Sequence, residues 1–225
     1  MKRKLISIVI PTLNEEENIK ELLNEVKKEL RKYNYRYEII VVDGHSKDNT
    51  VKIARKLGAK ILYDSVGKGS ALRKGMKHAK GDIVVSMDAD LSNKPNELRL
   101  LIAGIETGYD ICMGSRFLTG GGTEDMPLIR KIGNKLFILL VNFIFKTHYT
   151  DLCYGYRSFT KDALRKLNLK EDKFGIETEI SIKAAKLGLK VLEVPSLEKR
   201  RKAGEAKLRT FRDGYVILKT IFKNL

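Results

Sequence analysis

Residues 83–90 have the sequence Ile-Val-Val-Ser-Met-Asp-Ala-Asp, and this stretch decides how the fold is interpreted. Its first five residues carry no charge, as is typical of a buried strand, and Asp88 and Asp90 follow one residue apart. In open α/β sheets, ligands bind at the carboxyl ends of the strands. Two carboxylates at that position suit a divalent cation whose shell substrate phosphates complete. Taken alone, the pair is explained equally well by an Asx turn at the end of a strand.

Strand and helix patterns alternate along the chain before this stretch. Strands are predicted at residues 5–10, 37–42, 60–63 and 83–87, and helices at residues 15–32, 48–57 and 68–79. This β-α-β-α-β-α-β order predicts a doubly wound, mostly parallel sheet. Gly58, Gly81 and Gly108 stand where helices are expected to end in the left-handed conformation.

After residue 90 the alternation becomes irregular. A helix is predicted at residues 95–104, a strand at 110–114, a flexible Gly-Gly-Gly stretch at 120–122, a helix at 129–145, an irregular segment at 151–157, helices at 161–167 and 176–187, and a strand at 190–194. No internal repeat or low-complexity linker divides the chain. We therefore expect one α/β domain over residues 1–208 and a basic amphipathic helix over residues 209–225.

The composition is that of a folded globular protein with a strong positive charge. The chain has 225 residues, of which 43% are hydrophobic and 32% charged, and 44 Lys and Arg against 28 Asp and Glu leave a net charge of +16. Such an excess favours a polyanionic partner: a phosphate-rich substrate, an anionic membrane surface or a nucleic acid. A lysine-rich surface like that of thermophilic proteins explains part of it.

The cysteines and the apolar segments indicate a cytoplasmic protein. Cys112 and Cys153 are the only cysteines and form no Cys-x-x-Cys pair, which is typical of a reducing compartment. The apolar start is too short for a secretion signal, because Pro11 and Asn14 follow at once. The apolar run at residues 136–145 is interrupted by Asn142 and is too short to span a bilayer. No transmembrane helix is expected.

Three further polar loops are predicted at the same edge of the sheet as Asp88 and Asp90. They comprise residues 11–15, 43–44 and 67–69, which follow the first three predicted strands. Each loop has a local explanation as a helix start, a turn or a pair of loop glycines. Their convergence on one edge favours a nucleotide site, although the Gly-x-Gly at 67–69 is not placed as in a dinucleotide-binding fold.

The ordered motifs resemble those of family 2 glycosyltransferases with the GT-A fold, and most closely the dolichyl- or polyprenyl-phosphate mannose and glucose synthases. The likeness covers nearly the whole chain. The residues that carry it are 8–19 (Ile-Val-Ile-Pro-Thr-Leu-Asn-Glu-Glu-Glu-Asn-Ile), 41–46 (Val-Val-Asp-Gly-His-Ser), 67–71 (Gly-Lys-Gly-Ser-Ala), 88–90 (Asp-Ala-Asp), 114–116 (Gly-Ser-Arg), 151–157 (Asp-Leu-Cys-Tyr-Gly-Tyr-Arg), 193–195 (Glu-Val-Pro) and 204–208 (Gly-Glu-Ala-Lys-Leu).

The resemblance implies a role for each matched position. Mg2+ or Mn2+ would bind Asp88 and Asp90, with Ser92 where mannosyl-transferring members have a metal-binding Gln. Leu13 also departs from the family, whose members often have Tyr there. The resemblance therefore leaves open whether the donor nucleotide is GDP or UDP and whether the sugar is mannose or glucose. The nucleotide-sugar donor would be bound by Pro11, Leu13, Glu15, Val41, Asp43, Lys68, Asp88, Ala89 and Asp90.

The implied reaction transfers a hexose, with inversion, onto dolichyl or polyprenyl phosphate. The leaving nucleoside diphosphate gains negative charge, which a metal stabilises, and a lipid phosphate is already an anionic nucleophile that needs positioning more than a base. Arginine suits that task because its guanidinium binds phosphate in a bidentate fashion. We predict Asp90, Arg116 and Arg130 as catalytic residues. The expected acceptor-phosphate contacts are Arg116, Arg130, Asn134, Arg200 and Arg201, with Lys207 in a similar role.

Other functions remain open alternatives. Transfer to a polysaccharide, glycolipid or protein hydroxyl would need a base, for which Glu177 and Glu179 are candidates, although a helix start explains both. In aspartyl-phosphate hydrolases, Asp-x-Asp usually follows the first strand, whereas here it follows the fourth. Nucleic-acid binding has only charge in its favour, and we expect none.

Two apolar segments bear on membrane binding. Residues 136–145 are apolar almost all round, which suits either a buried core helix or a helix at a membrane interface. In the tail, one helical face carries Phe211, Tyr215, Leu218, Phe222 and Leu225, with basic residues interspersed. Packing against the domain and binding to an anionic membrane surface are both consistent with this pattern. We expect a peripheral protein at the cytoplasmic membrane face.

Overall fold

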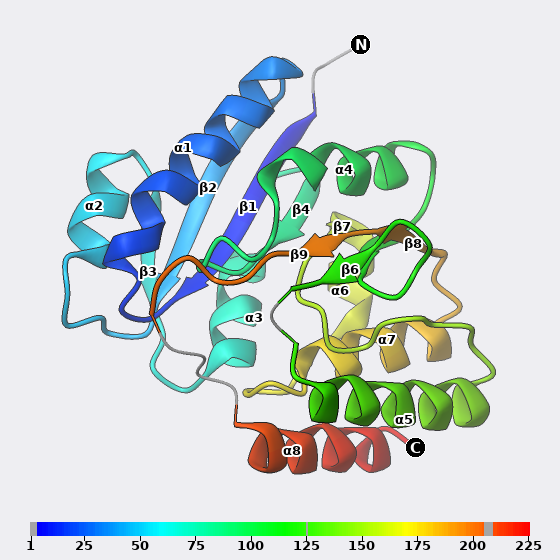
Figure 1. The fold of residues 1–225 in the computed structure, drawn as a ribbon. Coiled ribbons are helices and arrows are strands. Elements are labelled where there is room, and N and C mark those ends of the chain that lie inside the picture. Colours follow the sequence, from blue (N-terminus) through cyan, green and yellow to red (C-terminus); the bar gives the residue numbers. More distant parts are fainter. Residues whose placement is uncertain (1–3, 125, 205–208) are drawn as a thin grey trace.

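A seven-stranded sheet forms the centre of the molecule (Figure 1). The computed structural model describes residues 4–124, 126–204 and 209–225. The strand order is β3-β2-β1-β4-β7-β5-β8, and a second sheet pairs β6 with β9. The strands are β1 (Leu5–Thr12), β2 (Arg36–Asp43), β3 (Lys60–Tyr63), β4 (Ile83–Ser86), β5 (Ile111–Ser115), β6 (Gly122–Thr123), β7 (Arg157–Thr160), β8 (Val191–Pro195) and β9 (Leu197–Glu198).

Helices cover both faces of this sheet (Figure 1). On one face lie α1, α2 and α4, and on the other α3, α6 and α7, against which α5 and α8 pack. The helices are α1 (Glu16–Lys32), α2 (Thr50–Lys56), α3 (Lys68–His78), the 3-10 turn η1 (Pro95–Glu97), α4 (Leu98–Glu106), α5 (Leu128–Phe145), α6 (Lys161–Leu167), α7 (Ile176–Lys186) and α8 (Thr210–Lys223). The predicted doubly wound α/β fold is confirmed.

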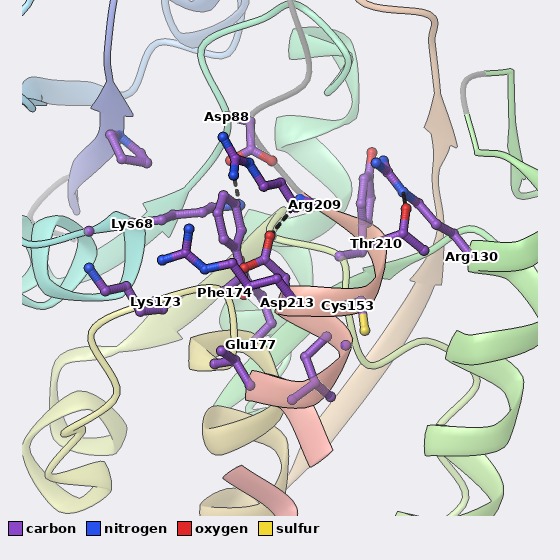
Figure 2. A pocket seen from close by; sticks show the side chains of 18 of the residues that line it. Lys68, Asp88, Arg130, Cys153, Lys173, Phe174, Glu177, Arg209, Thr210 and Asp213 are labelled. Carbon is purple, nitrogen blue, oxygen red and sulfur yellow. Dashed lines mark hydrogen bonds and ion pairs between the residues drawn. The ribbon is translucent and has the colours of Figure 1, made fainter. Parts of the chain in front are cut away.

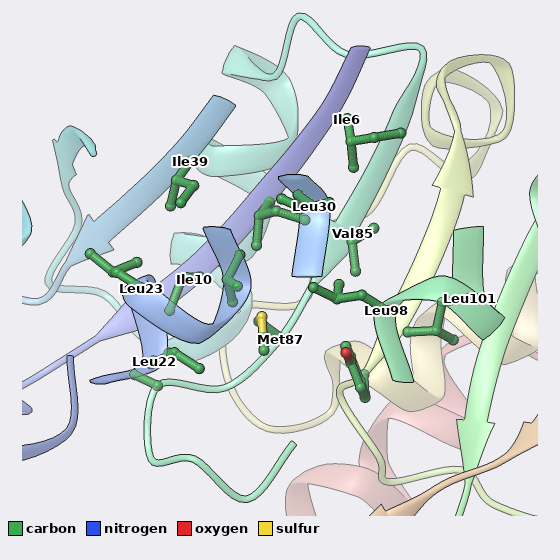
Figure 3. Packing of buried hydrophobic residues seen from close by; sticks show 14 of the residues in the cluster. Ile6, Ile10, Leu22, Leu23, Leu30, Ile39, Val85, Met87, Leu98 and Leu101 are labelled. Atoms are coloured by element: carbon green, nitrogen blue, oxygen red, sulfur yellow. The ribbon is translucent and has the colours of Figure 1, made fainter. Parts of the chain in front are cut away.

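Alternation of side chains across the strands builds two hydrophobic cores. In β1, Ile8 faces the core beneath α1 and α4, and Val9 faces the core beneath α3. Figure 3 shows the first core, where Leu22 and Leu23 of α1 pack close to Ile10. Both faces of the central strands are buried, which accounts for their nearly continuous hydrophobic sequence.

The parallel register brings the polar loops to one edge. In the β1–β2 pair, Thr12 lies opposite Asp43, so the loops that follow these strands leave the sheet together. The backbone N–H of Met87, just beyond β4, donates to the carbonyl of Val9 at 3.2 Å. Asp88 and the residues after it therefore emerge beside the β1–α1 connection.

Strand β7 was not predicted, because it follows the irregular segment 151–157 without a helix of its own. It lies antiparallel between β4 and β5, with Val85 opposite Ser158. This insertion is the one departure from a parallel arrangement in the large sheet of the described residues. It carries the preceding segment, residues 151–156, across the carboxyl edge of β4.

The glycine prediction is correct at two of three positions. Gly58 and Gly108 have φ angles of +75° and +100° after their helices, whereas Gly81 does not have a positive φ. A Cβ at Gly81 would lie 2.7 Å from the backbone nitrogen of Ser7, so close packing, and not a left-handed turn, calls for glycine there.

Helix α5 is not a buried core helix. Of its 18 residues, only Asn134 and Val141 are buried, and Phe143 is 85% exposed.

Helix α8 packs against α7 through Ile217 and Ile221 and leaves an apolar face exposed. The tail therefore packs against the domain, but not through the predicted face, since Phe211, Tyr215, Phe222 and Leu225 are exposed. The boundary at residue 208 lies outside the described residues. Within the described part, no helix has the length and hydropathy needed to cross a bilayer.

The packing of α3 on the sheet predicts opposite effects for two helical glycines. A Cβ at Gly75 would collide with Val9 and Val42, whereas a Cβ at Gly133 in α5 meets no atom within 4 Å. We expect Gly75→Ala to lower the free energy of unfolding by about 1–3 kcal/mol through overpacking. Gly133→Ala should raise it by up to about 1 kcal/mol through helix propensity. Urea unfolding of both variants checks this, and equal effects would contradict it.

Candidate active site

A cavity of about 940 Å³ lies at the carboxyl edge of the sheet (Figure 2). Its walls come from the connections after β1, β3 and β4, from the segment before β7, and from α5, α7 and α8. This is the place where an open α/β sheet binds ligands. Of the predicted site residues, the cavity brings together Pro11, Leu13, Glu15, Lys68, Asp88, Ala89, Asp90, Ser92, Arg116, Arg130, Asn134 and Arg201.

Three predicted residues do not line the cavity. Val41 is fully buried in the first hydrophobic core, so its side chain has a packing role in this structure. Asp43 is also fully buried, and its carboxylate accepts hydrogen bonds from the backbone N–H and the hydroxyl of Ser46. It thereby holds the loop after β2. Arg200 is exposed beyond the lining, and Lys207 lies outside the described residues.

Asp88 and Asp90 both face the cavity, and each carboxylate is paired with a cation. Nζ of Lys68 lies 2.8 Å from Oδ1 of Asp88, and a guanidinium nitrogen of Arg201 lies 2.9 Å from Oδ2 of Asp90. The turn that follows Asp90 is fixed locally, because the N–H of Ser92 donates to Oδ1 of Asp90 at 3.1 Å.

The carboxylates fit a divalent cation that keeps substrate ligands. Asp88 and Asp90 offer oxygen donors on the cavity wall, and Ser92 lines the same wall. No group of three or more His, Cys, Asp or Glu in the described part of the chain is arranged to hold a metal. Two carboxylates suit Mg2+ or Mn2+ bound together with phosphates, and not a cation enclosed by protein ligands alone.

Lys68 is held between two carboxylates. Besides Asp88, its Nζ lies 3.0 Å from Oε1 of Glu177, which is 3% exposed at the start of α7. Burial alone would lower the pKa of Lys68, but Asp88 and Glu177 outweigh it and raise the pKa above its usual value. The ammonium is therefore charged at neutral pH.

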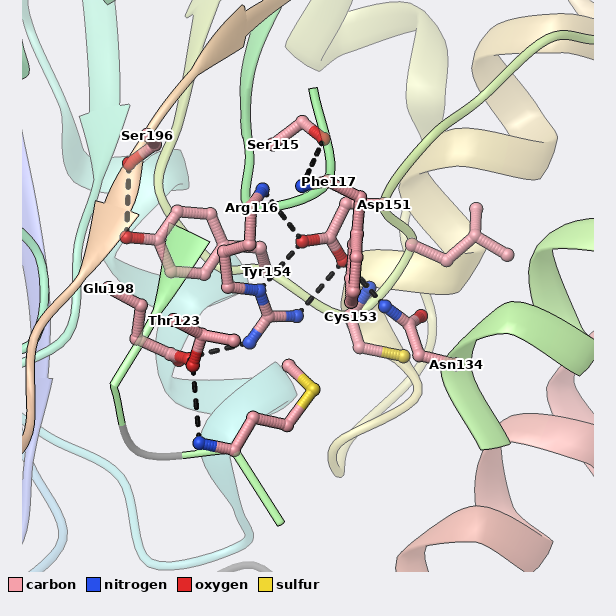
Figure 4. A network of polar contacts seen from close by, with 12 residues as sticks. Ser115, Arg116, Phe117, Thr123, Asn134, Asp151, Cys153, Tyr154, Ser196 and Glu198 are labelled. Carbon is pink, nitrogen blue, oxygen red and sulfur yellow. Dashed lines mark hydrogen bonds and ion pairs between the residues drawn. The ribbon is translucent and has the colours of Figure 1, made fainter. Parts of the chain in front are cut away.

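Arg116 occupies the centre of a buried polar network (Figure 4). Its Nε and one terminal nitrogen donate to the two oxygens of Asp151 at 2.7 and 2.9 Å, and its other terminal nitrogen donates to Glu198 at 2.9 Å. The guanidinium lies 4.7 Å from the ring centroid of Tyr154. These contacts direct its main donors to protein groups, which favours a positioning role over direct binding of phosphate.

Asn134 belongs to the same network. Its amide nitrogen donates to Oδ1 of Asp151 at 2.9 Å. Because an ionised carboxylate only accepts hydrogen bonds, this contact fixes the orientation of the amide. Burial alone would raise the pKa of Asp151, but Arg116 and Asn134 outweigh burial and lower the pKa.

A second buried arginine fixes the segment that crosses the site. Arg157 is 1% exposed and donates to the carbonyls of Leu152 and Tyr154, each at 2.9 Å. It also donates to the carbonyl of Glu177 at 2.9 Å. The segment before β7 and the start of α7 are thereby bound to one guanidinium.

The far end of the cavity is formed by α5 and α8. Nε of Arg130 in α5 donates to the hydroxyl of Thr210 in α8 at 3.1 Å, which joins the two helices (Figure 2). Apolar lining on this side comes from Ile129, Phe137, Phe211, Val216, Ile217 and Leu218. The cavity thus has a charged end at the sheet and an end between two helices where apolar side chains lie beside the charged Arg209, Arg212 and Asp213.

Comparison with protein families decides the class of the protein. The family model for glycosyl transferase family 2 matches residues 7–167. The chain belongs to glycosyl transferase family 2. The prediction of the family from the sequence is confirmed, and this family 2 glycosyltransferase is an enzyme.

Curated relatives are similar over nearly the whole chain. The glycosyltransferase is 36% identical to a dolichol-phosphate mannosyltransferase of Pyrococcus furiosus over 98% of its residues, but it spans only 61% of that protein's length. It is 32% identical to a dolichyl-phosphate hexose transferase of Haloferax volcanii, covering 97% of this chain and 92% of that protein. The predicted resemblance to these synthases is confirmed at moderate identity.

Solved structures confirm the GT-A fold. Glucosyl-3-phosphoglycerate synthase of Mycobacterium tuberculosis, in complex with Mn2+, UDP and glucosyl-3-phosphoglycerate, has a TM-score of 0.76 and 20% identity. The match covers 98% of this chain and 80% of the synthase. At 20% identity, the similarity between the synthase and this glycosyltransferase shows a shared fold and nothing more.

Several residues of the glycosyltransferase's cavity were not singled out by sequence reasoning. Lys173 and Phe174, between α6 and α7, carry no motif, and the ring of Phe174 lies 5.9 Å from Nζ of Lys68. Asp151 stood in a family motif without an assigned role. Residues 209–218 were interpreted as a helix that packs against the domain or binds a membrane surface, because no local pattern indicates that they return to the sheet edge.

The Arg116–Asp151 pair predicts an acid-sensitive part of the glycosyltransferase's stability. The folded-state pKa of Asp151 lies below its ordinary value of 3.8, so its contribution is present above that value and is lost as pH falls through the folded pKa. Asp151→Asn leaves Arg116 buried without its bidentate partner and should cost about 3–5 kcal/mol at pH 7. The variant should also lose less stability than the wild type on acidification.

Urea unfolding between pH 7 and pH 3 measures both effects. Asp162→Asn is the matched control, because Asp162 pairs with Arg165 on the exposed surface of α6. It should change stability by less than about 0.5 kcal/mol. An unchanged pH dependence in Asp151→Asn would contradict the assignment.

Proposed function

We propose that this glycosyltransferase moves a hexose from a GDP-mannose- or UDP-glucose-type donor onto dolichyl or polyprenyl phosphate. The observation that carries the proposal is a single cavity with carboxylates and cations at the sheet edge and an apolar wall between α5 and α8. A nucleoside diphosphate suits the first end, and a phosphate with a long apolar chain suits the second. The names of the two relatives, a dolichol-phosphate mannosyltransferase and a dolichyl-phosphate hexose transferase, support a hexose and a dolichyl phosphate.

The donor is assigned to the sheet edge. Pro11, Leu13 and Glu15 would contact the nucleoside, and Asp88, Asp90 and Ser92 would hold Mg2+ or Mn2+. When bound, the cation stabilises charge on the leaving diphosphate. Lys68 and Arg201 add positive charge beside the same carboxylates. A single displacement by the acceptor inverts the configuration of the sugar carbon.

The acceptor phosphate is assigned to Arg130 and Arg201, which face the cavity from α5 and from the segment after β9. A phosphate monoester is anionic at neutral pH and attacks without a general base once two cations offset its repulsion from the donor. Arg116 and Asn134, with Asp151 between them, shape the wall behind it.

A hydroxyl acceptor is less well supported. Glu177, the candidate base, is buried and paired with Lys68. Glu179 accepts hydrogen bonds from the backbone N–H groups of Lys170 and Glu171 and pairs with Lys183, so it faces away from the cavity lining. Neither carboxylate has the freedom that a base for a sugar hydroxyl needs.

The acceptor also implies that the protein binds an anionic membrane surface. Helices α5 and α8 lie side by side (Figure 1). Lys135, Arg212, Lys219 and Lys223 are exposed among their apolar residues, a combination suited to anionic lipid. That the protein binds the cytoplasmic face of the membrane stays a prediction. Exposed apolar side chains on the two helices, and at Leu225 just beyond α8, are Leu128, Ile129, Ile132, Leu136, Leu139, Phe143, Phe211, Tyr215, Phe222 and Leu225.

Incubation with radiolabelled nucleotide sugars and polyprenyl phosphate tests the reaction. Label should enter the organic phase with one donor, and with Asp90→Ala transfer should fall by about a thousandfold or more, as for a lost transition-state contact. Circular dichroism should show Asp90→Ala folded, because Asp90 is on the cavity wall. Full activity of Asp90→Ala, or label that stays in water-soluble products, would refute the proposal.

The assignment of Arg130 predicts a selective defect. Arg130→Ala should raise the KM for lipid phosphate about tenfold, the size of a lost charged hydrogen bond, with little change in the KM for the donor. Lys131→Ala removes a neighbouring charge from α5 outside the cavity lining and is the control. Equal increases in both KM values would remove Arg130 from the acceptor site.

Vesicle sedimentation tests the membrane surface. Phe143→Ser should weaken binding to phosphatidylglycerol vesicles by at least about tenfold, because a fully inserted Phe contributes about 1.5–3 kcal/mol. Leu187→Ser, at the end of α7, removes an exposed apolar side chain elsewhere and should have little effect. Binding to neutral vesicles should be weaker than to anionic ones. The assignment is wrong if both variants bind like the wild type.

A further inference from the structure

Lys68 is placed where a bound cation would act. It is the first residue of α3, and its ammonium lies 2.8 Å from Oδ1 of Asp88 and 3.0 Å from Oε1 of Glu177 (Figure 2). Its side chain is 17% exposed, and that of Asp88 is 29% exposed, so Asp88 is the partner that faces the cavity more openly. The side chain of Glu177 is 4% exposed, so Glu177 is the more enclosed partner.

The surroundings leave little room for the three groups to spread. A Cβ at Gly155 would lie 3.1 Å from Nζ of Lys68, 3.2 Å from Oε1 of Glu177 and 3.4 Å from Oδ2 of Asp88. The backbone of Gly155 therefore packs closely against the charged groups of all three residues. The ammonium is confined next to Asp88 by packing as well as by attraction.

A divalent cation on Asp88 meets this ammonium at close range. Two positive charges that share one carboxylate repel each other strongly when water is largely excluded. The cation must therefore displace Lys68 from Asp88 or bind weakly. Glu177 keeps the displaced ammonium nearby, and a donor diphosphate would offer it a new anionic partner.

We propose that Lys68 is a resident counter-ion that couples the binding of the divalent cation to that of the nucleoside diphosphate. Without the diphosphate, the cation has to break the Lys68–Asp88 pair with no compensation. With the diphosphate present, the ammonium transfers to the phosphates, and both ligands bind more tightly together. This rests on the proposed nucleotide-sugar site but not on the lipid acceptor or on the sugar.

Mn2+ binding without acceptor tests the coupling, by electron paramagnetic resonance or calorimetry. Removal of Lys68 alone leaves Glu177 free to bind metal, so the decisive comparison is Glu177→Gln against Lys68→Met/Glu177→Gln. The double variant should bind Mn2+ alone about tenfold more tightly, since a close charge pair of this kind changes affinity by about that factor. Thermal unfolding without ligand shows that each variant is folded.

For nucleotide binding, the loss of Lys68 should have the opposite effect. In the presence of Mn2+, the double variant should bind GDP and UDP more weakly than Glu177→Gln does, so the enhancement of Mn2+ binding by nucleotide should shrink. Lys173→Met is the charge control, because Lys173 lines the same cavity but its Nζ donates to the carbonyl of Val66 and not to Asp88.

Each outcome decides the proposal. Tighter Mn2+ binding with a reduced nucleotide effect supports it, as does Mn2+ binding by the double variant where Glu177→Gln binds none. It is overturned by unchanged Mn2+ affinity, by an equal shift in Lys173→Met, or by absence of Mn2+ binding in every variant. Failure of lipid transfer in the extraction assay leaves these measurements unaffected, which separates the two proposals.

Discussion

The site depends on one buried guanidinium. Arg157 binds two carbonyls of its own segment and one at the start of α7, so the floor and one wall of the cavity share a single anchor. Burial lowers the pKa of this arginine, and the nearby carboxylates of Glu177 and Asp151 offset part of that decrease in pKa. A buried charge satisfied by neutral carbonyls stabilises one geometry of the loop strongly, because any other arrangement leaves donors without partners.

Around this anchor, cations and carboxylates alternate across the cavity. Lys68 and Arg201 each neutralise one aspartate, and Arg116 is enclosed by Asp151 and Glu198. The protein's large positive charge is therefore not simply spread over its surface, since a few charges are fixed at defined points of the cavity. These points are where phosphate oxygens of substrates would replace protein carboxylates as partners.

Much of the fold was predictable because its signals are local. The strands from residue 5 to residue 86 and the helices between them follow hydrophobic periodicity, and the carboxyl ends of those strands locate Asp88 and Asp90. Strand β7 was missed because only four residues form it and its pairing with β4 and β5 arises from tertiary structure. The partners of Arg116 were missed for the same reason, as 35 residues separate it from Asp151 and 82 from Glu198. Val41 was assigned to the site by family resemblance, but strand alternation turns it into the core.

The two ends of the cavity are translated at different times. Residues 11–15, 67–68 and 88–92 contribute to the sheet-edge end, whereas residues 211–218 of α8 supply many of the apolar side chains at the other end. A growing chain on the ribosome therefore synthesises the charged half of the site well before the apolar half. Until α8 has emerged, the surface of α7 that Ile217 and Ile221 later cover stays open to chaperones.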